Sequence, residues 1–317
     1  MTALTDTWIQ SHLDSPVHAI EKVQDGAVGA VWRVLTETNS YYFKTCAEGF
    51  RHEVPLMHYL AEHFPADIPV VLGADIERGW LLIADAGTPL RTQIRETENF
   101  ALLEGMMRQY ARFQQATIPH LEPLLEYVPD RRADKLAALY KDLISDEKLL
   151  LVGQENGVTV EELMLLQALD IDALCQKLAD SPLPNTLHHD DFHDNNAAIK
   201  DDNIRFFDFG EACIAHPFFS LMVILRVAKY LHKLDDAMLN QLRDAYLSEW
   251  TDYAPLDALR EEAAGALRLA ALCRALTWRD LVRYGDAKHI EEDLDAPPYW
   301  LMTFFYDTPM AIEYKQT

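Results

Sequence analysis

The hydrophobic pattern of this 317-residue chain changes from strand-like to helical near residue 90, and this change restricts the folds open to it. Residues 29–46 hold two apolar and aromatic runs, GAVWRVLT and YYFKTC, on either side of the polar tip ETNS, which is typical of a β-hairpin. Helical spacing of apolar residues follows over 50–64, and two short strands are predicted within 68–87. From Thr92 onward the spacing is helical almost throughout. The pattern predicts an α+β protein with its strands first.

A turn at Gly87 and Pro89 separates the two parts of the chain. The chain is about twice the ~150-residue length typical of one domain, so we expect two compact units or two lobes. We place the smaller, β-rich lobe at residues 1–88 and the larger, helical lobe at 89–317.

Composition excludes several classes of protein. Apolar residues make up 49% of the chain and charged residues 25%, which is typical of folded globular proteins. Lys and Arg number 28 and Asp and Glu 51, giving a net charge of −23 that disfavours binding to nucleic acid or an anionic membrane. The same charge weakly favours a cationic small molecule as substrate, although screening over a Debye length of ~8 Å limits the effect.

The cysteines and the first residues of the chain indicate the cellular compartment of the protein. The four cysteines are far apart and form no CxxC pair, so we expect reduced thiols. The longest apolar stretch, PFFSLMVIL, is less than half the ~20 residues that a membrane span needs. The opening MTALTDTWIQSHLDS lacks the basic start and apolar run of a secretory signal. We therefore expect a cytoplasmic protein; the sequence says nothing of its oligomeric state.

The segment 183–212, LPNTLHHDDFHDNNAAIKDDNIRFFDFGEA, is unusually rich in polar side chains. Within it His189, Asp191 and Asn196 satisfy the pattern HxDxxxxN. Two short apolar runs follow, and after them Asp208 precedes Phe209 and Gly210. This order resembles the catalytic loop and the DFG segment of kinases.

Phosphoryl transfer explains why these residue types recur at this spacing. The reaction needs a carboxylate to hold the acceptor hydroxyl, and oxygen ligands to hold Mg²⁺ on the nucleotide phosphates. Mg²⁺ takes hard oxygen ligands and keeps several waters, so Asp208 and Asn196 suffice as metal ligands. A hairpin between them would bring both side chains back to one point. Asp191, ionised at pH 7, would orient the hydroxyl and accept its proton.

The register of the loop is ambiguous, because His188, Asp190 and Asn195 also satisfy HxDxxxxN. We prefer Asp191 as the base, since the apolar Phe192 then follows it and can anchor the loop in the core. Asp190 is the alternative base. A zinc site at His188, His189 and His193 is disfavoured because the surroundings indicate a loop rather than a helix. His189 is expected to support the catalytic loop through hydrogen bonds.

The same segment resembles the aminoglycoside phosphotransferase and choline kinase family, whose members read HGDxHxxN and then ID(W/F)G(D/E)A. Here residues 189–196 read HDDFHDNN and residues 207–212 read FDFGEA, with Asp190 in place of the usual glycine. HPFFSL, at 216–221, resembles the DPxxDL continuation of that family. The resemblance implies a protein-kinase-like two-lobed fold.

The resemblance also implies roles in the small lobe. Lys44 would bind the α- and β-phosphates of ATP, and Glu53 would pair with it. Gly26 and Gly29 form a degenerate phosphate loop, and adenine would meet backbone groups between Ile83 and Asp85.

Together these observations predict an enzyme that uses ATP and Mg²⁺ to phosphorylate a hydroxyl of a small acceptor, with a cationic compound such as an aminoglycoside or an amino alcohol favoured. GTP as donor and an amine as acceptor are alternatives within the same site. A catalytically inactive kinase-like protein that binds a nucleotide or a partner is the non-enzymatic alternative. The intact set of Asp191, Asn196 and Asp208 argues against it.

Overall fold

The structure is a computed structural model that describes residues 3–311. It confirms the α+β class, with strands gathered early in the chain and helices after them. Two compact units are present. Unit 1 contains the chain up to Thr97 together with Asn195–Gly210 and Arg283–Glu291, and unit 2 contains Glu98–Asp194, Glu211–Val282 and the chain from Glu292 onward. The lobe boundary after residue 88 stays a prediction.

An antiparallel sheet forms the centre of unit 1, and its strand order is β1-β2-β3-β5-β4. The hairpin expected over residues 29–46 is its β2–β3 pair, in which Val31 lies opposite Lys44. Lys44 also lies opposite Leu81 of β5, so this lysine sits on the central strand. The strands are β1 (Val17–Gly26), β2 (Gly29–Thr36), β3 (Ser40–Cys46), β4 (Val71–Asp75) and β5 (Trp80–Ala84).

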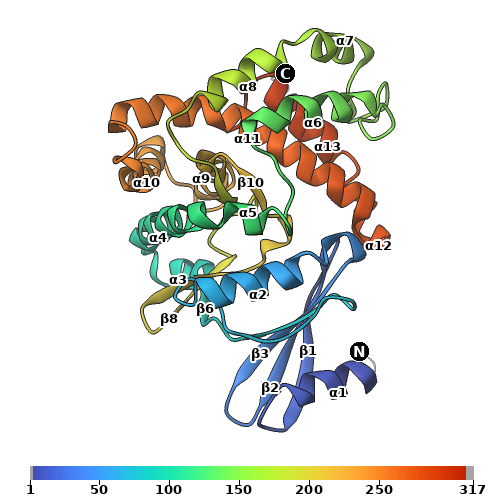
Figure 1. Ribbon diagram of the computed structural model, residues 1–317, viewed down its shortest axis with the longest axis vertical. Helices are drawn as coiled ribbons and strands as arrows, with labels where there is room; N and C mark the ends of the chain where they lie inside the picture. The colour runs from blue at the N-terminus through green and yellow to red at the C-terminus, as the bar shows by residue number, and fades with distance from the viewer. Residues whose placement is uncertain (1–2, 312–317) are drawn as a thin grey trace. The chain divides into compact units, whose positions relative to one another are not determined.

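The two faces of this sheet have different neighbours. Because successive side chains of a strand point to opposite faces, Phe43 and Lys44 face different ways. Phe43 packs in an apolar cluster with Ile9 of α1 (Ala3–Ser11), and Figure 1 shows that helix beside the blue strands. Lys44 instead contacts Glu53, the first residue of α2 (Glu53–His63). One face therefore carries the core and the other carries charge.

A second, three-stranded sheet in unit 1 has the order β6-β8-β9. Its strands are β6 (Thr88–Pro89), β8 (Ala197–Lys200) and β9 (Asn203–Phe206), and α3 (Leu90–Thr97) follows β6. The β8–β9 turn consists of Asp201 and Asp202, which both have positive φ, as a two-residue type I′ turn requires. This is the hairpin expected between Asn196 and Asp208.

Helices make up most of unit 2, drawn from green to red in Figure 1. The middle of α11 is its most buried part, since residues 269–277 are all shielded from solvent. A short antiparallel pair joins β7 (Thr186–His188) to β10 (Cys213–Ala215). The main helices are α4 (Ala101–Thr117), α6 (Ala133–Ser145), α7 (Val160–Ala168), α8 (Ile171–Ala179), α9 (Leu221–Tyr230), α10 (Asp236–Leu247), α11 (Leu256–Tyr284) and α13 (Ala296–Phe305).

Two one-turn α-helices are α5 (Leu121–Leu124) in unit 2 and α12 (Ala287–Ile290) in unit 1, and short 3-10 helices cover Glu48–Phe50, Ile118–His120, Phe209–Glu211, Pro217–Ser220 and Ser248–Trp250. Within residues 3–311, every helix is too short or too polar to cross a bilayer.

Candidate functional site

Lys44, Glu53 and Asp208 meet on the charged side of the β1–β5 sheet, and we call them the lysine cluster. The Nζ of Lys44 lies 2.6 Å from Oε2 of Glu53 and also contacts Oδ1 of Asp208. Lys44 is 9% exposed and Glu53 only 1%, so both charges are removed from water. The lysine and glutamate that the family resemblance singled out are therefore paired.

The electrostatics of the lysine cluster follow from this burial. Desolvation alone would lower the pKa of Lys44, but the carboxylates of Asp208 and Glu53 outweigh it and raise that pKa. Burial also raises the pKa of Glu53, against the opposing effect of Lys44. With one ammonium and two carboxylates, the cluster in its ionised form has a net charge of −1. It therefore favours an additional cation.

Asp208 is placed by the β8–β9 hairpin. It follows β9 with a φ of 66°, and the preceding residue, Phe207, donates its backbone N–H to the carbonyl of Asn196 at 3.1 Å. The two predicted metal ligands thus lie at the two ends of one hairpin. Gly210 comes next, and a Cβ there would lie 3.0 Å from Oε2 of Glu53. A larger residue at 210 would crowd the lysine cluster.

A hollow of about 330 Å³ in unit 1 opens beside the lysine cluster. A volume of this size falls at the lower end of small-molecule sites. Its wall combines apolar side chains, such as Val31, Met57 and Leu81, with polar ones. Lys44, Glu53, Ile83, Asp85, Asn196 and Asp208, all named from the sequence, line this one hollow.

Gly26 and Gly29, by contrast, are not among the residues described as lining this hollow. They pair with each other across the β1–β2 turn, whereas Gln24 and Val31 form part of the lining. Gly29 has a φ of 145°, and a Cβ there would lie 1.9 Å from the carbonyl oxygen of Thr45. The close approach of β3 therefore requires this glycine, and its role towards a phosphate stays a prediction.

In unit 2, Asp190 has the left-handed backbone conformation that glycine adopts readily. Its φ is 62°, which gives a physical reason for the glycine usual at this position in the related loops. The side chain is 1% exposed and accepts hydrogen bonds from Thr277 and from Nε2 of His188, the latter at 3.0 Å. So enclosed a carboxylate cannot meet a substrate in this structure.

Asp191 is more open, because 28% of its side chain is exposed. Its carboxylate lies 3.3 Å from Nη2 of Arg274 and 3.3 Å from Nε2 of His193. Burial would raise the pKa of Asp191, but the hydrogen bond from His193 and the charge of Arg274 hold it well below its usual range. Asp191 is therefore an ionised carboxylate with access to solvent.

The residues around Asp191 hold its loop in the core. Phe192 is 2% exposed and stacks on the ring of Tyr110, with 3.9 Å between ring centroids. The backbone N–H of His189 donates to the hydroxyl of the same tyrosine at 3.0 Å, and His189 itself is fully buried. Tyr110, on α4, thus supports the loop on both sides of Asp191.

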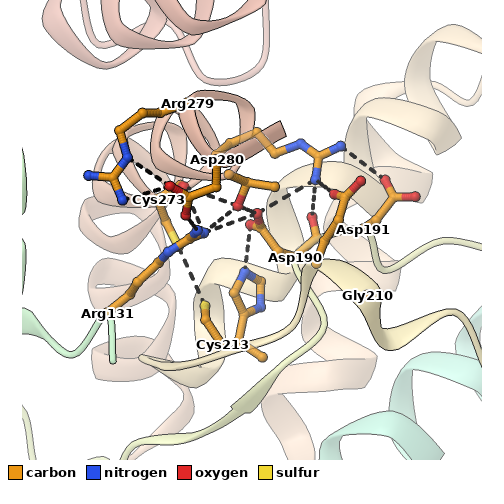
Figure 2. Close-up of polar contacts among 12 residues, drawn as sticks. Arg131, Asp190, Asp191, Gly210, Cys213, Cys273, Arg279 and Asp280 are labelled. Atoms are coloured by element: carbon orange, nitrogen blue, oxygen red, sulfur yellow. Dashed lines mark hydrogen bonds and ion pairs between the residues drawn. The ribbon is translucent and has the colours of Figure 1, made fainter. Parts of the chain in front are cut away.

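Figure 2 shows the network around Asp190, which we call the arginine cluster. Asp190 lies 3.7 Å from a guanidinium nitrogen of Arg131 and 3.6 Å from one of Arg274. Arg274 also contacts Glu211, and Arg131 lies 2.9 Å from Asp280. The cluster consists of Arg131, His188, Asp190, Asp191, Glu211, Arg274, Thr277, Arg279 and Asp280.

The pKa values of two carboxylates in this cluster shift in opposite directions. Burial would raise the pKa of Asp190, but the hydrogen bond from His188 and the charge of Arg274 lower it below its usual range. Glu211 differs, since burial and the neighbouring aspartates raise its pKa to about 7 despite Arg274.

Arg131 and Arg274 were not identified from the sequence. A charged residue inside the apolar run ALCRALTW of α11 is a signal that could have found Arg274, because a buried arginine needs an acidic partner.

The four cysteines are free thiols, and all are buried. Among the described residues, one group has the spacing of metal ligands: His188, Cys213 and Cys273, with ligand atoms within 4.8 Å of one another. Both ring nitrogens of His188 already have hydrogen-bond partners, in Asp190 at 3.0 Å and Ser220 at 2.8 Å. Both ring nitrogens are therefore engaged in hydrogen bonds, and neither offers a lone pair to a metal ion.

Several solved structures share this fold. The choline kinase LicA from Streptococcus pneumoniae is 15% identical, with 88% of this chain and 90% of that one covered and a TM-score of 0.60. The amicoumacin kinase hAmiN, crystallised with AMP-PNP, Ca²⁺ and Ami, is 15% identical over 98% and 96% of the chains, with a TM-score of 0.62. Aminoglycoside phosphotransferase APH(4)-Ia, crystallised with ADP and hygromycin B, is 17% identical over 98% of each chain, with a TM-score of 0.55.

These similarities confirm the kinase-like fold expected from the catalytic-loop pattern. No curated protein matches the chain in sequence. The profile of the phosphotransferase enzyme family matches residues 19–259, which span both the lysine cluster and the loop of Asp191. With that match over more than half of its length, the chain belongs to the phosphotransferase enzyme family.

Proposed function

We propose that this protein is a small-molecule kinase that transfers the γ-phosphate of ATP to a hydroxyl group of its acceptor. The observation that carries the proposal is the lysine cluster, which borders a hollow of about 330 Å³ with one ammonium and two carboxylates. The ammonium group can bind phosphates, and the one carboxylate charge that it leaves unneutralised can bind a divalent cation. A nucleoside triphosphate with its metal ion supplies both.

Each group of the hollow has a role in this proposal. Lys44 binds the α- and β-phosphates, and Glu53 fixes the position of its ammonium group. Adenine occupies the part near Ile83 and Asp85. The hAmiN and APH(4)-Ia structures contain AMP-PNP and ADP, which supports a nucleotide as the ligand here.

Asn196 and Asp208 fit Mg²⁺ as ligands, because one amide and one carboxylate oxygen are the hard donors this ion prefers. They lie at the two ends of the β8–β9 hairpin, so their spacing is set by one turn. When bound, Mg²⁺ neutralises charge on the nucleotide phosphates. Asp208 also contacts Lys44, so it links the metal position to the phosphate-binding lysine.

Asp191 is the proposed general base. The hydroxyl oxygen forms a bond to the γ-phosphorus, the bond from that phosphorus to the ADP oxygen breaks, and the hydroxyl proton passes to Asp191 and then to water. The 28% exposure of its side chain supports this role over Asp190, which is 1% exposed, and its lowered pKa keeps it ionised and able to accept a proton. His189 has a supporting role, because it is fully buried and its backbone N–H anchors the loop to the hydroxyl of Tyr110.

The first experiment measures nucleotide binding. The melting temperature of the purified protein is recorded with ATP, ATP plus Mg²⁺, and GTP plus Mg²⁺. We expect ATP plus Mg²⁺ to raise it most, and we expect Lys44→Met and Asp208→Asn each to abolish most of that increase. Lys141→Met and Asp172→Asn are matched controls, since that pair is exposed on unit 2. An unchanged melting temperature with all three additions would reject the proposal.

The second experiment measures transfer. ADP formation is followed over a panel of hydroxyl compounds, and the phosphorylated product is identified by ³¹P NMR. Nucleotide binding without transfer to any compound in the panel, or to water, would instead favour an inactive nucleotide-binding protein.

A further inference from the structure

Unit 2 contains a second hollow, of about 300 Å³, among α9, α11 and α13. Val223 and Val227 of α9 supply an apolar wall, and Trp300 of α13 supplies an aromatic one. Tyr230 and Leu231 also line it, together with two arginines, Arg226 on α9 and Arg274 on α11. Its described lining includes no acidic side chain.

Arg274 connects this hollow to the proposed base. Its side chain lines the hollow, and its Nη2 lies 3.3 Å from Oδ1 of Asp191. A compound in the hollow therefore lies against Arg274, the residue whose guanidinium contacts Asp191. The Nε of Arg274 is buried and has no hydrogen-bond partner in the described part of the chain, while its side chain is only 8% exposed. Such a donor is costly to leave unpaired, so it favours a ligand that accepts a hydrogen bond.

The two arginines differ in how far their charges are compensated. Arg274 contacts the carboxylates of Asp191 and Glu211 and lies close to that of Asp190. Arg226 instead donates hydrogen bonds to neutral groups: the carbonyl of Pro309 at 3.0 Å, the carbonyl of Ala311 and the hydroxyl of Tyr299 at 2.6 Å. Within residues 3–311, no carboxylate forms an ion pair with Arg226.

Arg226 therefore gives the hollow a positive charge at its aromatic side, where its guanidinium lies 4.7 Å from the ring centroid of Trp300. The net charge of −23 does not decide which ligand this hollow accepts, because salt screens charges beyond ~8 Å. A cationic group placed here would be repelled by Arg226.

We propose that this hollow binds the acceptor and that the acceptor is an anionic hydroxyl compound with an apolar body, such as a hydroxy acid. Its anionic group pairs with Arg226, its body packs on Trp300 and the two valines, and its hydroxyl is directed past Arg274 towards Asp191. The inference rests on the proposed kinase function and names its substrate class. It replaces the cationic acceptor favoured by net charge alone.

The test uses three probes that share a hydroxymethylphenyl body and carry an anionic, a neutral or a cationic group in the para position: 4-(hydroxymethyl)benzoate, 4-(hydroxymethyl)benzamide and 4-(hydroxymethyl)benzylamine. Binding is first measured without nucleotide by ligand-observed NMR titration, and ADP formation is then measured with ATP and Mg²⁺. We expect the anion to bind at least about tenfold more tightly than the cation, as one charge-assisted hydrogen bond provides. We also expect it to be the best acceptor of the three.

Variants test whether the preference for the anion comes from Arg226. Arg226→Gln should remove the preference for the anion, and Arg226→Lys, which keeps the charge, should retain most of it. Lys229→Gln removes the same charge from the same helix at a position outside the described lining, and should leave the preference unchanged. Because Arg226 also contacts backbone near the end of the described chain, the wild-type ranking of the three probes is decisive if Arg226→Gln unfolds.

Tighter binding of the benzylamine, equal binding of all three probes, or binding of none would overturn the inference. So would an anion preference that survives in folded Arg226→Gln. These outcomes are separate from the fate of the kinase proposal, which fails if ATP and Mg²⁺ do not raise the melting temperature. Nucleotide binding with transfer to the benzylamine in preference would reject the acceptor class alone.

Discussion

The lysine cluster and the arginine cluster both bury several charges, but only the second compensates nearly all of them. In the lysine cluster, Lys44 is the single cation between two carboxylates. In the arginine cluster, each carboxylate has a guanidinium within 4 Å, and Arg131 and Arg274 are each shared by more than one of them.

This difference in charge compensation indicates that the lysine cluster binds a ligand and that the arginine cluster stabilises the fold. An incomplete charge set next to a hollow gains free energy when a ligand completes it, whereas a complete set loses free energy when any member is removed. We therefore expect substitutions in the lysine cluster to affect ligands and substitutions in the arginine cluster to affect folding. Asp191 contacts Arg274 of the arginine cluster, but its side chain is exposed enough to meet a substrate. A substitution of Asp191 therefore tests best whether a residue affects folding or turnover.

The largest expected effect is on turnover in Asp191→Asn. Loss of a general base lowers kcat about 10²- to 10⁴-fold. Stability should change little, because Arg274 keeps Glu211 and Asp190 as partners. Steady-state kinetics with the acceptor found by the panel, together with the melting temperature, checks both. Full turnover in Asp191→Asn with none in folded Asp190→Asn would assign the base to Asp190 and break the comparison.

Asp190→Asn should act on stability instead. Two buried guanidinium groups would lose a carboxylate, and breaking a buried ion pair by removing one partner costs about 3–5 kcal/mol. Urea unfolding measures the change. Asp172→Asn, in an exposed pair with Lys141, is the control and should cost about 1 kcal/mol or less. Equal effects of the two substitutions would contradict a structural role for the arginine cluster.

His188 should make stability depend on pH. Burial alone would lower its pKa, but the hydrogen bond to Asp190 raises the pKa to about 9, above the value of 6.5 for a free histidine. The folded state therefore holds the proton more tightly than the unfolded state. The resulting stability is fully present below pH 6.5 and is lost as pH rises through 9.

The gap between these pKa values corresponds to about 3 kcal/mol at most. Free energies of unfolding between pH 6 and pH 9.5 measure it, and His188→Gln should flatten the decline. His63→Gln, at an exposed position, should leave the decline as it is. A decline of the same size in His188→Gln would assign it to other groups.

Thr277→Val should have the smallest effect. The Thr277 hydroxyl donates to Asp190 and accepts from Arg131, so its loss leaves one buried donor and one buried acceptor less well satisfied. A cost of about 1–2 kcal/mol is expected from chemical unfolding. Thr251→Val, at an exposed site, should cost less than about 0.5 kcal/mol. No cost at Thr277 would show that the guanidinium contacts alone hold Asp190.

The sequence predicts this protein best where the pattern is local. Alternation and turn residues predicted the 29–46 hairpin, because neighbouring residues decide a strand's faces. The hairpin between Asn196 and Asp208 was predicted in the same way, from two short apolar runs around the polar tip KDDN. Lys44 and Glu53 needed the family resemblance, since a single lysine on a strand has no pattern of its own.

Tertiary pairing was not predictable in the same way. Arg131 and Arg274 are separated by more than a hundred residues, and only the packing of α11 against the Asp190 loop brings them to one carboxylate. The choice between Asp190 and Asp191 rested on Phe192, and the buried stack of that ring on Tyr110 supports it. The roles of the site residues stay predictions until the variants are measured.

The backbone conformation of Asp190 has a consequence for how this loop can change during evolution. Glycine at position 190 would relieve the left-handed φ of 62°, yet it would leave two enclosed guanidinium groups with one acid fewer. We therefore expect Asp190→Gly alone to destabilise the fold while Arg131 and Arg274 are both present. The three positions are then expected to be epistatic: a substitution at 190 is better tolerated when both arginines are exchanged with it.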